Sequence, residues 1–140
     1  MMKSKEFNQH RQSFFEQAMT LSDAKSVEYT ISNEDRLHNF KHVAARLGIT
    51  PEQALMVYVL KHVDAICNDA KTGIQVSDET VFSRAMDICN YMVLYTGLKK
   101  DTYHENSIKH SGDGTGSIGG NSQDDLEPAK WRDLTRQEEA

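Results

Sequence analysis

From Thr50 the chain reads TPEQALMVYVLKH, a helix start followed by seven consecutive apolar residues. Thr50 is a preferred N-cap residue, Pro51 suits the first helical position, and Gln53 stands where a capping box has its second partner. The apolar run Ala54–Leu60 covers the whole circumference of a helix, so it cannot all face one side of a surface helix. We therefore expect a central helix to about Asp69, buried in its own chain or in an oligomer interface.

Three other segments have apolar residues at helical spacing. They are residues 5–21, residues 32–47 with Ser32 as N-cap and Gly48 after the last turn, and residues 77–96, ended by Gly97. Residues 70–77 are expected to connect the third and fourth helices, with Ile74–Val76 as a candidate short extended piece. The predicted fold is all-α, a compact bundle of about four helices within residues 1–100.

The composition changes after Lys99, where glycine and serine become frequent and aliphatic residues rare. We expect a flexible linker at 101–125. Residues 126–140 include Trp131 and are expected to form a short C-terminal helix or a tail. The glycines between 112 and 120 lack the strand, helix and lysine of a phosphate-binding loop, which favours the linker interpretation.

The bulk properties narrow the class of protein. The chain has 140 residues, enough for one domain, and a formal net charge of -5, which argues against general nucleic-acid or anionic-membrane binding. No apolar segment resembles a signal peptide or a membrane span. Cys67 and Cys89 lie in apolar helical contexts and are expected to be buried, reduced thiols of a cytoplasmic protein.

The fourth predicted helix carries a polar stripe. Glu79, Ser83, Asp87 and Tyr91 recur every four residues, with Asn90 beside them. A stripe of this kind is often only the solvated face of a helix. Here it ends among apolar residues, which favours a site: the carboxylate of Asp87 suits a divalent cation or a hydroxyl, and the amide of Asn90 suits a base or a sugar.

Charge also returns where the central helix leaves the core, at Lys61, His62 and Asp64. The simplest interpretation is a plain helix exit. A sharper one has Lys61 contacting a phosphate or pairing with Asp87 across a helix interface.

The second helix contributes Arg36 and Asn39, and an asparagine inside a helix needs a hydrogen-bonding partner or a ligand to offset its poor propensity. His38 and His42 are four residues apart and could share a metal ion, although further ligands are not evident nearby.

These polar residues follow one another in an order that resembles small phage and prophage proteins, the nucleotide-modification-associated domains, which are distantly similar to the all-α MazG-type nucleotide pyrophosphohydrolases. The resemblance covers residues 25–98. It rests on Tyr29, Asp35-Arg36-Leu37-x-Asn39-Phe40-Lys41, Thr50-Pro51-Glu52-x-Ala54-Leu55, Lys61-His62, Glu79 and Asp87-x-x-Asn90-Tyr91.

The pyrophosphohydrolases carry Glu-x-x-Glu on one helix and Glu-x-x-Asp on the next, four carboxylates that hold magnesium. This chain has Asp87-x-x-Asn90 at the place of the second motif, and Lys61-His62-Val63-Asp64 with a single carboxylate at the place of the first.

The resemblance implies a nucleotide-binding protein, with magnesium-dependent hydrolysis of a phosphoanhydride as a further expectation. The catalytic candidates are Asp87, Glu79 and Asp64, with the metal on Asp87 and Glu79. The ligand-binding candidates are Arg36 and Lys61 for phosphate, Asn39, Asn90 and Tyr91 for base or sugar, and His62.

The expected partners are a nucleotide and a second copy of the chain, as a homodimer or a higher homo-oligomer. The alternative function is a non-catalytic phage accessory protein that sequesters a nucleotide signal or binds a host protein. A third interpretation is that the polar residues only pair with one another and fix the helix register.

Overall fold

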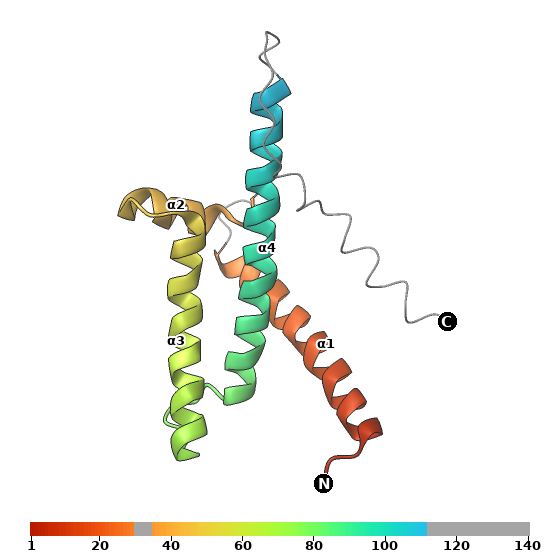
Figure 1. Cartoon of the computed structure of the whole chain (residues 1–140). Coiled ribbons are helices and arrows are strands. Elements are labelled where there is room, and N and C mark those ends of the chain that lie inside the picture. The colour runs from red at the N-terminus through yellow and green to blue at the C-terminus, as the bar shows by residue number, and fades with distance from the viewer. Residues whose placement is uncertain (30–34, 112–140) are drawn as a thin grey trace, which may run out of the picture. The chain divides into compact units, whose positions relative to one another are not determined.

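The structure is a computed structural model that describes residues 1–29 and 35–111. The described part contains four helices and no strand: α1 (Ser4–Tyr29), α2 (His38–Leu47), α3 (Pro51–Thr72) and α4 (Val81–Ser111) (Figure 1). This confirms the all-α prediction, and the candidate extended piece at Ile74–Val76 is not a strand. Residues 1–108 form one compact unit, to which every contact described below belongs.

The central helix α3 begins as predicted. The Thr50 hydroxyl accepts a hydrogen bond from the Gln53 backbone N–H at 3.1 Å, and the Gln53 side-chain oxygen accepts one from the Thr50 N–H at 2.9 Å. This capping box satisfies two backbone groups that a bare helix end leaves unpaired. The helix continues to Thr72, beyond the expected end at Asp69, and stops at Gly73, which adopts φ 64°. A left-handed residue of this kind is a common helix terminator.

The start of α2 differs from the prediction. The expected N-cap, Ser32, lies outside the described residues, and the helix begins only at His38. The carboxylate of Asp35 accepts a hydrogen bond from the Leu37 backbone N–H at 2.9 Å, which holds a local turn in place of a helical one. The predicted end at Gly48 is confirmed, with φ 66°.

Helix α4 also departs from the prediction at both ends. It begins at Val81, where the Thr80 hydroxyl accepts the Ser83 N–H at 3.2 Å, and not at residue 77. It passes through Gly97 and ends at Ser111, so the expected helix end at Gly97 and the expected linker over 101–111 are wrong. The remaining linker and tail predictions, 112–125 and 126–140, lie outside the described residues.

Tertiary contacts beyond Gly97 explain why α4 does not end there. Leu98 is 3% exposed and packs in the core, while Lys99 pairs with Glu52 of α3 at 3.1 Å. Asp101 pairs with Lys41 of α2 at 2.6 Å. Burial and pairing of this kind outweigh the cost of about 1 kcal/mol that an interior glycine imposes on a helix.

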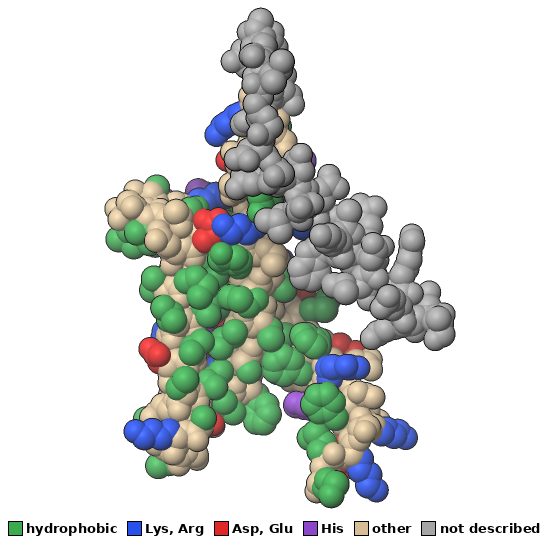
Figure 2. Space-filling model, viewed as in Figure 1, with side chains coloured by type: hydrophobic (Ala, Val, Ile, Leu, Met, Phe, Trp, Pro, Cys, Tyr) green, Lys and Arg blue, Asp and Glu red, His purple; other side chains and the backbone are tan. Residues whose placement is uncertain are grey.

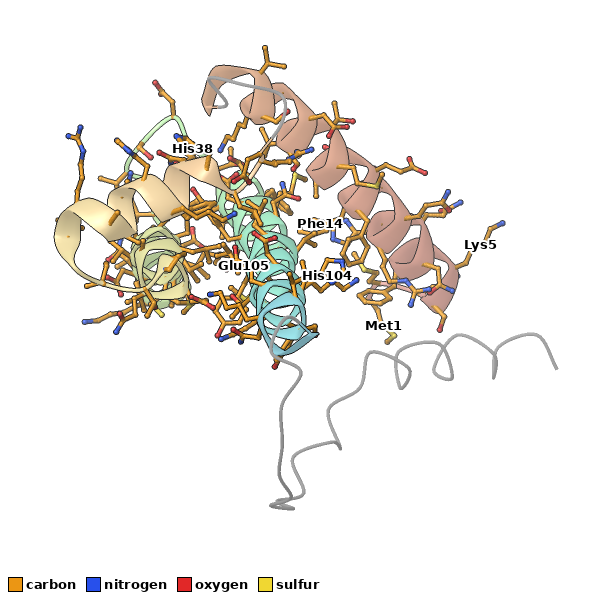
Figure 3. The ribbon with its side chains drawn as sticks, turned by 90° about the horizontal axis from the view of Figure 1, so that it is seen from above. Met1, Lys5, Phe14, His38, His104 and Glu105 are labelled. Carbon is orange, nitrogen blue, oxygen red and sulfur yellow. The ribbon has the colours of Figure 1, made fainter. Side chains whose placement is uncertain are left out.

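The core lies where α2, α3 and α4 meet. Its buried members are Phe40, Leu55, Val59 and Leu98. Helix α1 packs against the other helices through its C-terminal half, in which Ala18 is buried. Residues 4–13 of α1 are all exposed, and Lys5 points away from the other helices (Figure 3). Helix α1 runs eight residues past its expected end at Leu21, and these residues reach the site described below.

Large apolar side chains are exposed on α3 and α4, among them Val57, Leu60, Phe82 and Val93. Figure 2 shows apolar side chains gathered over these two helices. Cys67, expected to be buried, is exposed, whereas Cys89 is partly buried. None of the described helices is both long enough and apolar enough to cross a membrane.

Candidate functional site

A cleft of about 350 Å³ lies within the helical unit and takes side chains from all four helices. Its polar lining combines three cations, two carboxylates and two amides. These are Lys25, Arg36 and Lys61; Glu79 and Asp87; and Asn39 and Asn90. His62 and Tyr91 line the cleft as well, so all six predicted ligand-binding residues are found there.

Asp87 is the most deeply buried charged residue of the cleft, at 3% exposure. Both of its carboxylate oxygens accept hydrogen bonds from the Lys25 ammonium, at 2.7 and 2.8 Å. Its partner is thus Lys25 of α1 and not Lys61, so the predicted Lys61–Asp87 pair is wrong. Pairing is what makes burial of this carboxylate tolerable, since an isolated buried charge is very costly.

The sequence contained a signal for Lys25. Phe14, Ala18, Leu21 and Lys25 follow one another at helical spacing, so a first helix longer than predicted places Lys25 on its inward face. A first helix that ends at Leu21, as the sequence predicts, leaves Lys25 out; the observed helix, which ends at Tyr29, includes it.

His62 lies beside Asp87 and is itself 7% exposed. Its Nε2 is 3.8 Å from an Asp87 carboxylate oxygen, which is too long for a hydrogen bond, and its buried Nδ1 has no hydrogen-bond partner among the described residues. Burial lowers the pKa of His62, while the negative charge of Asp87 opposes this effect only in part. The imidazole is therefore neutral at pH 7 and retains a lone pair.

Glu79 completes a group of potential metal ligands. One ligand atom from each of His62, Glu79 and Asp87 lies within 4.8 Å of the others. Glu79 is also paired with Arg84 at 3.1 Å. The third predicted catalytic residue, Asp64, is exposed and does not line the cleft. It lies two residues after His62, which rotates it by about 200° around the helix and away from the cleft.

Three aromatic rings form an apolar wall. Tyr58 of α3 and Tyr91 of α4 stack with ring centroids 6.0 Å apart, and Phe40 of α2 meets them edge-on at 6.0 and 6.3 Å. Tyr58 was not predicted as a site residue because it lies inside the seven-residue apolar run. Beside the wall, the Asn90 amide donates a hydrogen bond to the Ala18 carbonyl at 2.8 Å, which ties α4 to α1 and fixes the amide's orientation.

The two remaining cations are less engaged. Arg36 donates to the Ser22 carbonyl and hydroxyl at 2.9 and 2.8 Å, and its contact with the exposed Asp23 is 3.5 Å long. Lys61 is exposed at the cleft and forms no ion pair with any residue that the structure describes. Both can therefore approach an anionic ligand without breaking a buried pair.

A magnesium nest of four carboxylates does not fit this cleft. Of the described acidic residues, only Glu79 and Asp87 line it, and Lys25 holds both oxygens of Asp87. Two magnesium ions of the pyrophosphohydrolase type would lack half of their carboxylate ligands.

Comparison of the chain with family models, with curated proteins and with solved structures found no match.

Proposed function

We propose that this protein binds a nucleotide in the cleft between its four helices and that binding requires no metal ion. The observation that carries the proposal is the combination of an aromatic wall, side-chain amides and available cations around one space of about 350 Å³. Small-molecule sites are typically clefts of this size, mostly apolar, with a few well-placed polar groups.

The base side of the proposed site is the wall of Phe40, Tyr58 and Tyr91. Aromatic faces bind nucleobases by stacking, which contributes about 1 to 3 kcal/mol per base. Asn39 and Asn90 line the same cleft. An amide both donates and accepts, so each can read the edge of a base or a sugar hydroxyl; Asn90 retains its oxygen and one N–H after bonding to Ala18.

The position of the phosphate in the proposed site follows from which cations of the cleft are not already paired with its acids. Lys25 is committed to Asp87, and Arg84 offsets Glu79. Lys61 and Arg36 are then the cations left for an anionic group, and charge-assisted hydrogen bonds from such groups are roughly twice as strong as neutral ones. We place phosphate beside Lys61 and Arg36.

Metal-dependent hydrolysis is the second candidate function, favoured by the proximity of Asp87 and Glu79 within the same cleft. The shortage of carboxylates supports binding over hydrolysis, because Glu79 and Asp87 are the only described acids that line the cleft, half of the four that a two-magnesium site uses. A binder without turnover suits a protein that sequesters a nucleotide signal. We propose that the chain is related to the phage nucleotide-modification-associated proteins, because its motifs follow the same order from Tyr29 to Tyr91. The alternative partner to a nucleotide is a host protein.

Native mass spectrometry of the full chain tests the proposal. The protein is incubated with pooled ribo- and deoxyribonucleotides, once with magnesium and once with EDTA. Lys61→Met and Arg36→Met are compared with Lys100→Met, which removes an exposed lysine of α4 outside the cleft.

The expected result is a nucleotide adduct of similar abundance with magnesium and with EDTA, reduced by at least about tenfold in the two cleft variants and unchanged in Lys100→Met. Conversion of a triphosphate to its monophosphate only with magnesium would establish the hydrolase instead. Absence of any adduct would overturn nucleotide binding.

A further inference from the structure

The cluster formed by His62, Glu79 and Asp87 has features that nucleotide binding does not use. It offers one nitrogen and two carboxylate ligands within 4.8 Å, from α3, α4 and the segment between them, at a point where two of the three residues are buried. Acidic residues gather on many protein surfaces, so the spacing alone is not sufficient to define a site.

The second observation is the state of His62. Its side chain is 9% exposed, its Nδ1 is unpartnered among the described residues, and its Nε2 faces Asp87 across 3.8 Å without a hydrogen bond. A buried imidazole normally hydrogen-bonds through at least one nitrogen, since leaving a polar atom unpaired costs about 1 to 3 kcal/mol. A nitrogen and an oxygen held slightly beyond hydrogen-bonding distance are spaced for an ion between them, with a small closing movement.

Lys25 already places a positive charge at this point. Its ammonium bridges the two oxygens of Asp87 but makes no hydrogen bond to His62 among the described contacts, so it satisfies only the carboxylate. A divalent cation would satisfy both. Lys25 is 40% exposed in its side chain, so it can swing into solvent when another cation arrives.

We propose that His62, Glu79 and Asp87 bind one divalent first-row transition-metal ion, and that Lys25 occupies this position when the ion is absent. The imidazole ligand selects ions such as Co²⁺, Ni²⁺ and Zn²⁺ over Mg²⁺, which prefers oxygen ligands and dehydrates reluctantly. The metal and the Lys25 ammonium compete for Asp87, so each weakens the binding of the other. This site stands independently of the nucleotide proposal.

Cobalt titration of the tag-free, EDTA-treated full chain tests the proposal, because the visible bands of Co²⁺ report its ligands. His62→Gln and Glu79→Gln remove ligands, and Glu79 is partly exposed, so its replacement leaves the core intact. Lys25→Met removes the competitor. His38→Gln is the matched control, because His38 stacks on His42 at 5.8 Å on α2 and could hold an ion elsewhere. Circular dichroism confirms folding of each variant.

We expect saturable binding that His62→Gln and Glu79→Gln weaken by at least about tenfold, that Lys25→Met strengthens by about tenfold, and that His38→Gln leaves unchanged. Mg²⁺ should not displace Co²⁺ at equal concentration. Equal affinity in the ligand variants, loss in His38→Gln, unchanged affinity in Lys25→Met, a thiolate band from a cysteine, or no saturable binding would each overturn the proposal.

Discussion

Asp87 determines which charges the cleft must contain, because a carboxylate that is 3% exposed must be neutralised by a nearby partner. The neutralising charge comes from Lys25 of α1, 62 residues earlier in the chain. The pair joins α1 to α4 in the same place where the cleft holds its acids. Its contribution is therefore both to stability and to the ligand preference of the site.

Replacing Lys25 by Met should destabilise the protein by about 2 kcal/mol, because Asp87 is left buried and unpaired; the partial exposure of Lys25 keeps the loss below that of a fully buried pair. Urea unfolding measures this. Adding Asp87→Asn to Lys25→Met should recover part of the loss, since the stranded charge is gone. Asp23→Asn, at an exposed position on α1, is the control. A loss no larger than that of the control would show that the ion pair contributes nothing.

Asp35 should make the protein sensitive to acid. Burial raises the pKa of Asp35. The hydrogen bonds from Lys41 and from the Leu37 N–H, together with the nearby positive charges, lower it by more than burial raises it. The net pKa therefore lies below the ordinary 3.8. The folded state then binds fewer protons than the unfolded state just below that value. Its stabilising contribution is complete above the unfolded pKa and is lost as the pH falls through the folded one.

The unfolding free energy should therefore fall as the pH drops from about 5 to about 2, and Asp35→Asn should make this slope shallower. Urea titrations at several pH values provide the measurement. Asp78→Asn, at an exposed position before α4, serves as the comparison. A slope that Asp35→Asn leaves unchanged would contradict the assignment.

Among the elements, α4 shows most clearly that tertiary packing can override a local sequence signal. Gly97 follows a periodic segment, and the sequence predicts a helix end there, the usual meaning of glycine at such a position. In the structure it is an interior helical residue beneath Leu37. Local propensity cannot show that Leu98 is buried by residues distant in sequence, and that burial carries the helix onward.

Gly97→Ala should stabilise the protein by about 0.5 to 1 kcal/mol, because alanine restricts the unfolded chain and favours the helix. The added methyl group would lie 3.7 Å from the Leu37 side chain, an ordinary contact. Gly48→Ala is the matched opposite: with φ 66° it should destabilise. Thermal unfolding compares them, and destabilisation by Gly97→Ala would mean that α4 does not pass through this position unbroken.

The caps of α3 and the end of α2 were predictable because they depend on neighbours within four residues, such as Thr50 with Gln53. The cleft was predictable in part for a related reason. Helical periodicity places Asp87, Asn90 and Tyr91 on one helix, and the return of charge after the apolar run singles out Lys61 and His62; the structure brings the two groups together. Lys25 and Tyr58 required knowledge of how separate helices meet. Asp64 lies one turn after Lys61, yet only Lys61 lines the cleft, because helical spacing does not show how far a site extends.

For the whole molecule, self-association stays a prediction. The seven-residue apolar run is only partly used by the core: Leu55 and Val59 are buried, whereas Val57 and Leu60 are exposed. If this face joins two copies, light scattering should give twice the monomer mass, and Val57→Glu should shift it to the monomer by burying an unpaired charge. A monomer at all concentrations would contradict the prediction.

Fluorine NMR of protein labelled with 3-fluorotyrosine is the measurement that bears most closely on nucleotide binding in the cleft. Signals are assigned with single Tyr→Phe variants, and ribo- and deoxyribonucleoside mono- and triphosphates are added in turn. Stacking of a base should shift the signals of Tyr58 and Tyr91, while Tyr103, exposed on α4, should stay in place. Nucleotides that leave the signals of Tyr58 and Tyr91 unchanged, or that shift the signal of Tyr103 alone, would rule out base stacking in the cleft.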